Sequence, residues 1–307
     1  MTIFALLAAA AVVLGHLAGP ALARQEWTQR HPVPAIVLWL ATLCAAVAAA
    51  VGFVAFAVFS SPQPGHTLVE WALSCASGHA HSGTWEAAIL SLPPVIAFLL
   101  AARIGVRRLR STISARHRHG EMLRLVTRET DELADTCILD HPIPIAYCLP
   151  ARGRPIVVSS GALDVLDPGQ LAAVLDHERA HLRGRHHLIV ALVDALAHTL
   201  PWAATFQHGR TALARLLEHA ADDTAARRHG ATTVFSALHK LTVLPSPAGT
   251  LGAGASAPQA LSTRLNRLSN PVASAHGRRL AWSAAALSSL LPVAILTGWM
   301  TAIALNC

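Results

Sequence analysis

The stretch His177-Glu178-Arg179-Ala180-His181, followed later by Glu218-His219-Ala220-Ala221-Asp222, decides the interpretation of this chain of 307 residues. Two histidines four residues apart lie on one face of a helix, so both imidazoles can reach one metal ion. Glu178 directly follows the first histidine, where its carboxylate can act as a general base toward water. Glu218 supplies the third ligand that such a site requires. The two stretches together therefore predict a zinc site.

Both motifs lie in segments whose apolar residues recur at helical spacing. Residues 168–188 read as one helix, with Asp167 as its N-cap and Pro168 at its first position. The expected buried residues are Leu171, Val174, Leu175 and Leu182 in this helix, and Leu213, Leu216, Leu217 and Ala221 in the second. The alternative is a pair of solvated histidines on a helix made polar by Arg179, Arg183 and Arg185. Glu218 and Asp222 argue against that alternative.

These residues resemble the H-E-x-x-H…E-x-x-A-D pattern of integral-membrane gluzincins, which include the HtpX and CAAX-processing proteases and the BlaR/MecR-type membrane peptidases. The resemblance implies that His177, His181 and Glu218 bind Zn²⁺ and that Glu178 is the catalytic base. It also implies that Asp222 orients a ligand histidine. Many relatives carry Asp five residues after the second motif histidine, where this chain has His186. This departure argues against assigning the role of that Asp to His186 or His187 but leaves the three ligands unaffected.

The composition is that of a membrane protein rather than an ordinary soluble domain. Hydrophobic residues make up 53% and charged residues only 13% of the chain, and the mean hydropathy is +0.45. The net charge of +7 comes almost entirely from arginine, because Lys240 is the single lysine. The arginines cluster beside apolar runs, and no nucleic-acid-binding motif is present. We therefore expect the lipid bilayer as a partner and no direct contact with nucleic acid.

Four apolar runs approach the length of about 20 residues that a membrane-spanning helix needs. They cover residues 2–19, 34–60, 87–106 and 280–305. The third contains Pro93-Pro94, which should kink it. The expected fold class is thus a mainly α membrane protein with about four transmembrane helices. It also includes an α+β gluzincin-type zinc peptidase domain, built from a small edge hairpin plus helices.

Arginine placement predicts the topology. Arg24 and Arg30 lie in the first connection, a dense group of arginines follows the third run, and Arg278 and Arg279 precede the fourth, whereas residues 61–86 hold no lysine or arginine. The expected organisation is a membrane region at 1–107, a cytoplasmic peptidase domain at 108–279 and a last span at 280–307. Both termini would lie outside the plasma membrane. The alternative, a signal peptide cleaved near Ala21-Leu22-Ala23, lacks a basic N-terminal region.

Residues 188–204 form a fifth apolar run that we do not expect to cross the membrane. They contain Asp194 and His198, which are costly at membrane depth. A single crossing here would also separate Glu218 from His177 and His181, and the three could not share one metal. The segment is therefore either a buried helix of the catalytic domain or an interfacial one, which Pro201-Trp202 would suit.

Residues 143–148 and 155–159 read as a hairpin that precedes the active-site helix. Pro144 would confine the first strand to an edge. The hypothesis is that Ile143, Ile145, Ala146 and Tyr147 form the edge with which an extended substrate pairs by β-augmentation. The alternative is an ordinary hairpin without substrate contact.

The remaining features are weaker. Residues 245–258 are rich in Gly, Ala, Ser and Pro and read as a loop. Residues 261–268 resemble the short R-I-x-R-L helix found late in these gluzincins, although a basic helix near the membrane explains them equally well. Five cysteines form no C-x-x-C pair. In the expected topology Cys75 and Cys307 both face outside, which allows a disulfide between them.

The expected function is that of a multi-pass membrane zinc endopeptidase, with Glu178 moving protons and one of His219, Tyr147 or His276 stabilising the oxyanion. The arrangement is most similar to BlaR/MecR-type peptidases without a penicillin-binding sensor domain. The resemblance implies a regulatory, antirepressor-like role on a protein or peptide substrate such as a cytosolic transcriptional repressor. One alternative is an HtpX-like quality-control protease. Another is a non-catalytic receptor or scaffold that retains zinc, which three ligands plus a base argue against.

Overall fold

The computed structural model describes residues 9–59, 85–129, 135–149, 155–243, 258–269 and 275–306. The chain divides into two compact units. The first unit comprises Met1–Arg108, Val193–Leu213 and Ala275–Cys307, and the second comprises Leu109–Leu192 and Ala214–Ser274. Three helices, α6 (Trp85–Val126), α9 (His186–Thr199) and α10 (Ala204–His229), contribute residues to both units.

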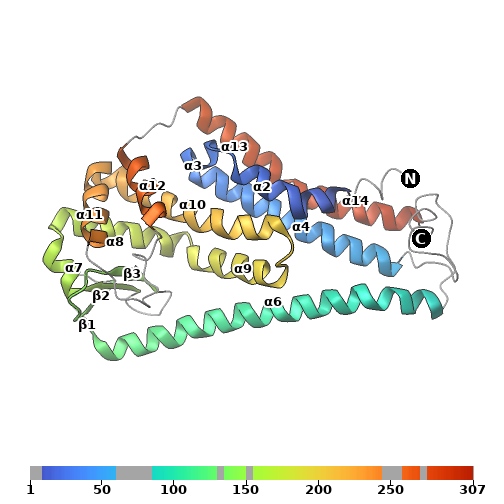
Figure 1. The fold of residues 1–307 in the computed structure, drawn as a ribbon, viewed down its shortest axis with the longest axis horizontal. Coiled ribbons are helices and arrows are strands. Elements are labelled where there is room, and N and C mark those ends of the chain that lie inside the picture. The colour runs from blue at the N-terminus through green and yellow to red at the C-terminus, as the bar shows by residue number, and fades with distance from the viewer. Residues whose placement is uncertain are drawn as a thin grey trace. The chain divides into compact units, whose positions relative to one another are not determined.

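The first unit is helical. It begins with the π-helical turn η1 (Val13–Leu17), α2 (Ala18–Ala23) and α3 (Trp27–Arg30), and it continues with α4 (Pro32–Phe59), α13 (Ala275–Ser289) and α14 (Leu291–Asn306). Helix α4 packs along α13 and α14 (Figure 1). Ala45 and Ala49 of α4 are fully buried, and Gly52 of α4 lies against the indole of Trp299 on α14.

Two helices among the described residues are long and apolar enough to cross a membrane, rather than the four expected. They are Pro32–Ala55 and Gly277–Thr301, which correspond to the second and fourth predicted runs. Within the described residues, the first run contributes to a shorter apolar helix, Ala9–Ala23. The third run is the first half of α6, a helix of 42 residues that passes unbroken through Pro93-Pro94 into a strongly basic second half.

The fifth apolar run forms α9, which has 14 residues. A helix of that length extends about 21 Å, less than the thickness of a bilayer core. Ala191, Val193, Ala195 and Ala197 are buried, whereas Leu188, Val190 and Leu192 are exposed. The expectation that this segment makes no lone crossing agrees with these dimensions.

The second unit contains a four-stranded mixed sheet. Its strands are β1 (Thr127–Glu129), β2 (Thr136–Leu139), β3 (Ala146–Cys148) and β4 (Ile156–Ser159), in the order β1-β2-β4-β3. β3 and β4 are antiparallel, as the expected hairpin requires, while β2 runs parallel to β4. β3 is the outermost strand on its side of the sheet within the described residues.

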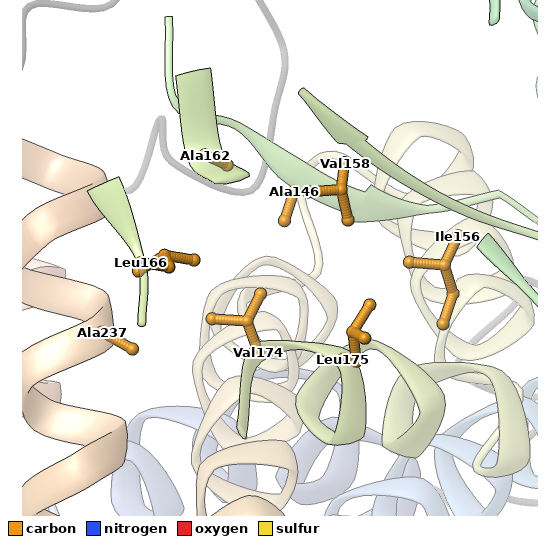
Figure 2. Packing of buried hydrophobic residues seen from close by; sticks show 8 residues of the cluster. All are labelled: Ala146, Ile156, Val158, Ala162, Leu166, Val174, Leu175 and Ala237. Carbon is orange, nitrogen blue, oxygen red and sulfur yellow. The ribbon is translucent and has the colours of Figure 1, made fainter. Parts of the chain in front are cut away.

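Helices cover one face of this sheet. α7 (Ser160–Val165) and α8 (Pro168–Arg183) contact the strands directly, and α11 (Ala231–Val243) packs against both of these helices. α12 (Pro258–Ser269) packs in turn against α11. Figure 2 shows Val174 and Leu175 of α8 pointing toward Ile156 and Val158 of β4, with Ala237 of α11 at the side. Most of the predicted apolar residues of α8 belong to this core, and Leu213, Leu216, Leu217 and Ala221 of α10 are buried as expected.

Helix α8 begins at the predicted residue, Pro168, but ends before the predicted residue 188. The Asp167 side chain accepts from the Gln170 backbone N–H, and the Gln170 side chain accepts from the Asp167 backbone N–H, which completes a capping box before Pro168. The helix stops at Arg183 instead of continuing to residue 188. Arg185 has a positive φ of 48°, which interrupts the helix, and α9 starts at His186. The single predicted helix is therefore two helices joined by a tight turn.

Candidate active site

Three side chains in the second unit bring ligand atoms to one point. His177 and His181 come from one face of α8, and Glu218 comes from α10. The Nε2 atoms of the two histidines lie 3.1 Å apart. The carboxylate oxygens of Glu218 lie 3.6 Å from His177 Nε2 and 3.4 Å from His181 Nε2. The three residues that the sequence predicts as ligands are thus brought together.

This spacing fits zinc. Ligand atoms about 2.0–2.1 Å from a tetrahedral Zn²⁺ lie about 3.3 Å from one another, close to the three separations observed. Burial together with the neighbouring His177 lowers the pKa of His181 to about 3, so that its imidazole is neutral and has a lone pair for a metal. Burial opposes the ionised form of Glu218, but His177 and Arg264 outweigh it and lower the pKa of Glu218 to about 2. The imidazole of His181 and the carboxylate of Glu218 can therefore both donate a lone pair to a cation.

Glu178 lies beside this triad on α8 and is 4% exposed. Burial, opposed by the neighbouring His177, raises the pKa of Glu178 to about 7. A carboxyl group with a pKa near neutrality can both take up and release a proton under ordinary conditions. Cys148 of β3 forms a hydrogen bond with Glu178, and burial, with the charge of Glu178, raises the pKa of the Cys148 thiol. The proton-transfer candidate therefore faces the edge strand.

Asp222 contacts the zinc ligand His177 on the side of the ring away from the metal site. Its Oδ1 lies 3.1 Å from His177 Nδ1, so the carboxylate can accept the Nδ1 proton and leave Nε2 free for the metal. Asp222 is in turn held by Arg264 of α12, whose Nε and Nη2 donate to its two oxygens at 2.8 and 2.7 Å. Burial opposes ionisation of Asp222, but the Arg264 and His177 hydrogen bonds outweigh it and lower the pKa.

Arg264 is the residue at this site that the sequence reasoning missed. It is 4% exposed, and its Nη1 also lies 3.0 Å from Glu218 Oε2. A signal was present in the sequence, because Arg264 falls between Leu261 and Leu268 on the apolar stripe of a short helix. An arginine on such a stripe is buried only with a partner.

The other predicted site residues have varied placements. Ala146 points into the core and Tyr147 lies on β3, while Ile143 and Ile145 precede that strand. His219 is fully buried, and neither of its ring nitrogens has a hydrogen-bond partner among the described residues. The predicted Cys75–Cys307 disulfide and the loop at 245–257 lie outside the described residues, as does the side chain of His276.

A His-His-Glu triad with a buried glutamate beside it is the arrangement that zinc metallopeptidases use. Residues 114–241, which contain His177, His181 and Glu218, match the family model of Peptidase family M48. The chain is also similar to the protein described as "Protease HtpX homolog" from Thermoplasma acidophilum, with 35% identity over 79 residues. That alignment covers 24% of this chain, and the chain spans 25% of that relative. No solved structure matches.

Proposed function

We propose that the protein is a membrane-bound zinc endopeptidase that hydrolyses a peptide bond of a protein substrate. The observation that carries this proposal is the convergence of His177, His181 and Glu218 beside the buried carboxyl group of Glu178. The two candidate membrane helices support a location in the membrane. A structural zinc site would fill its coordination with protein ligands. Here three ligands and a neighbouring base leave a position for substrate and water.

In the proposed reaction Glu178 moves the protons. Zinc, when bound, supplies a Lewis acid that polarises the scissile carbonyl and makes water a better nucleophile. Glu178 accepts the proton of the attacking water and then delivers it to the leaving amine. Asp222 keeps the His177 ring in the tautomer that presents Nε2 to the metal. Arg264 holds that carboxylate in place through two hydrogen bonds.

The outer edge of β3 is the proposed substrate-binding strand. Tyr147 pairs with Val157 on β4, and the Ser159 backbone N–H donates to the Ile145 carbonyl. Because bonding alternates along an antiparallel pair, the backbone N–H and C=O groups of Ala146 and Cys148 point away from β4. An extended substrate can pair with these groups beside Glu178. Replacing Ala146 with proline removes one outward N–H, so we expect a raised KM with little change in kcat.

The proposed topology rests on charge, and the proposed cellular role rests on the resemblance to BlaR/MecR-type peptidases. Arginine placement favours a cytoplasmic domain at 108–279 and termini outside the plasma membrane. A regulatory, antirepressor-like cleavage of a cytosolic transcriptional repressor is the role that this arrangement favours. Quality control of membrane proteins is a second candidate, favoured by the similarity to the HtpX homolog. Reporter fusions at Ser111 and at the C-terminus test the orientation. A reporter at Ser111 that is active only outside the cell contradicts it.

The decisive experiment compares the purified wild-type protein with Glu178→Gln in lipid nanodiscs. The glutamine variant should bind zinc with unchanged stoichiometry and lose cleavage of an unfolded protein substrate, because an amide cannot accept the proton. His181→Ala should lose both. Cleavage by Glu178→Gln at the wild-type rate would contradict the proposed role, and a zinc-loaded protein that cleaves nothing would favour a scaffold.

The same Glu178→Gln variant serves as a substrate trap in the native membrane. A single soluble DNA-binding repressor that co-purifies with the variant and not with the zinc-free His181→Ala protein supports signalling. A heterogeneous set of membrane proteins supports quality control instead. The comparison with His181→Ala matters because both variants are inactive, so that only the intact binding site differs between them.

A further inference from the structure

We propose that His186 is a positioning residue that fixes the orientation and tautomer of the zinc ligand His181. His186 Nδ1 lies 2.8 Å from His181 Nδ1, and the two rings stand at 90° with centroids 4.8 Å apart. This contact lies on the side of His181 opposite Nε2, the atom that faces His177 and Glu218. The inference concerns zinc binding and holds whether or not the protein cleaves peptides.

Only one placement of the protons on His181 and His186 allows His181 to bind a metal through Nε2. A neutral imidazole carries one N–H donor and one acceptor nitrogen. If Nε2 of His181 presents its lone pair to the metal, the proton must be on Nδ1, where the lone pair of His186 Nδ1 can accept it. His186 then carries its own proton on Nε2. With zinc on Nε2 of His181, the hydrogen bond can form only with His181 as the donor, and it then holds the ring in the orientation and tautomer that bind the metal.

The turn that precedes His186 positions the imidazole of His186 next to His181. A side chain at Gly184 would collide with the His186 ring, so glycine is needed for this close approach. Arg185 adopts a positive φ, which a non-glycine residue does rarely. Arg116 of α6 donates to the His187 carbonyl at 2.6 Å and so fixes the first turn of α9. Three independent local features thus direct His186 toward His181.

The Nδ1 atoms of the two ligand histidines therefore have different hydrogen-bond acceptors. Asp222, a carboxylate, lies behind His177, whereas a neutral imidazole lies behind His181. A carboxylate acceptor increases the basicity of the imidazole that donates to it, and a neutral acceptor does so less. His186 consequently orients its ligand without adding a further negative charge to a site that already holds Glu218 and Asp222.

The test measures zinc affinity by chelator competition in the purified full chain. His186→Ala should weaken zinc binding by about 10-fold to 100-fold, the range for lost support of a metal ligand. His186→Asp should recover most of the affinity, because a carboxylate can accept the same proton. Gly184→Ala should weaken binding like His186→Ala, since it displaces the ring without removing it. His187→Ala is the matched control and should bind zinc like the wild type.

Two further measurements separate positioning from folding. Circular dichroism of the zinc-free proteins should be the same for His186→Ala and wild type, and the visible spectrum of the cobalt-substituted variant should change. Wild-type zinc affinity in His186→Ala would overturn the proposal. Failure of His186→Asp to recover affinity would overturn it too, because the proposed contribution is a hydrogen-bond acceptor. Glu178→Gln should keep full zinc affinity, so failure of the peptidase proposal would leave this result unaffected.

Discussion

Arg264 of α12 and Asp222 of α10 form a buried, bidentate ion pair, although they are 42 residues apart in the chain. Their side chains are 4% and 1% exposed. The planar guanidinium matches the two carboxylate oxygens, a geometry that lysine cannot reproduce. Because Asp222 also contacts His177, the pair connects α12 to a zinc ligand.

Removal of Arg264 should destabilise the second unit strongly. Arg264→Gln leaves the Asp222 carboxylate buried without its charge partner, which costs about 3–5 kcal/mol when one member of such a pair is removed. Thermal unfolding in detergent micelles measures the change. The unfolding temperature of Arg264→Lys should lie between those of the wild type and Arg264→Gln. Arg183→Gln is the control, since Arg183 is exposed on α8. An unfolding temperature of Arg264→Gln equal to that of the control would refute this account.

Asp176 should make stability depend on pH in the acid range. Its buried carboxylate contacts Arg179, Arg228 and His229. Burial opposes ionisation, but the hydrogen bonds from His229 and the arginines outweigh it and lower the pKa of Asp176 to about 2. A folded-state pKa below the unfolded value of about 3.9 gives stability that is present above that value and is lost as the pH falls toward about 2.

The matched variant is Asp176→Asn. At neutral pH the wild type should exceed it by about 1–3 kcal/mol in free energy of unfolding. The difference should shrink between about pH 4 and pH 2, where the wild-type carboxylate becomes protonated. Urea unfolding at a series of pH values measures both quantities. A difference that stays constant through this range would mean that the charge of Asp176 contributes nothing.

Zinc removal should lower the thermal stability of the protein, and this effect should require the three metal ligands but not Glu178. A ligand that binds only the folded state stabilises it by about 4 kcal/mol at a free concentration of 1,000 times Kd. Wild type and Glu178→Gln should therefore both melt at a lower temperature after treatment with a chelator and recover with added zinc. Glu218→Gln should show little response in either direction. An unchanged zinc response in Glu218→Gln would exclude Glu218 as a ligand.

Local patterns were sufficient to predict much of the site. The spacing of His177 and His181 on α8, the cap at Asp167 and the apolar stripes of α8 and α10 each depend on residues a few positions apart. These features follow from helix geometry and capping chemistry, which are readable in a single sequence. The third ligand was recognisable because Glu218 and Asp222 also lie one helical turn apart.

Tertiary contacts were not predictable in the same way. The parallel pairing of β2 with β4 joins strands that no turn connects, and the Arg264–Asp222 pair joins distant helices. The contact of His186 with His181 depends on the unusual backbone of Arg185, because a continuous helix would have directed His186 elsewhere. Hydropathy alone likewise did not show that the third apolar run continues as one helix into a basic second half.

Gly52 should be essential for the packing of α4 against α14. A methyl group at Gly52 would overlap the indole of Trp299, which is 1% exposed and therefore has little room to move. Gly52→Ala should destabilise this helix pair by about 1–3 kcal/mol, as overpacking of a tight contact does. Gly15→Ala is the control, because a Cβ there has no atom within 4 Å to meet, and alanine is the better helix former. Thermal unfolding in nanodiscs should therefore show a lower transition for Gly52→Ala and an unchanged or higher one for Gly15→Ala. Equal transitions in the two variants would contradict this account, because they would mean that the Trp299 indole shifts to accommodate the methyl group without loss of stability.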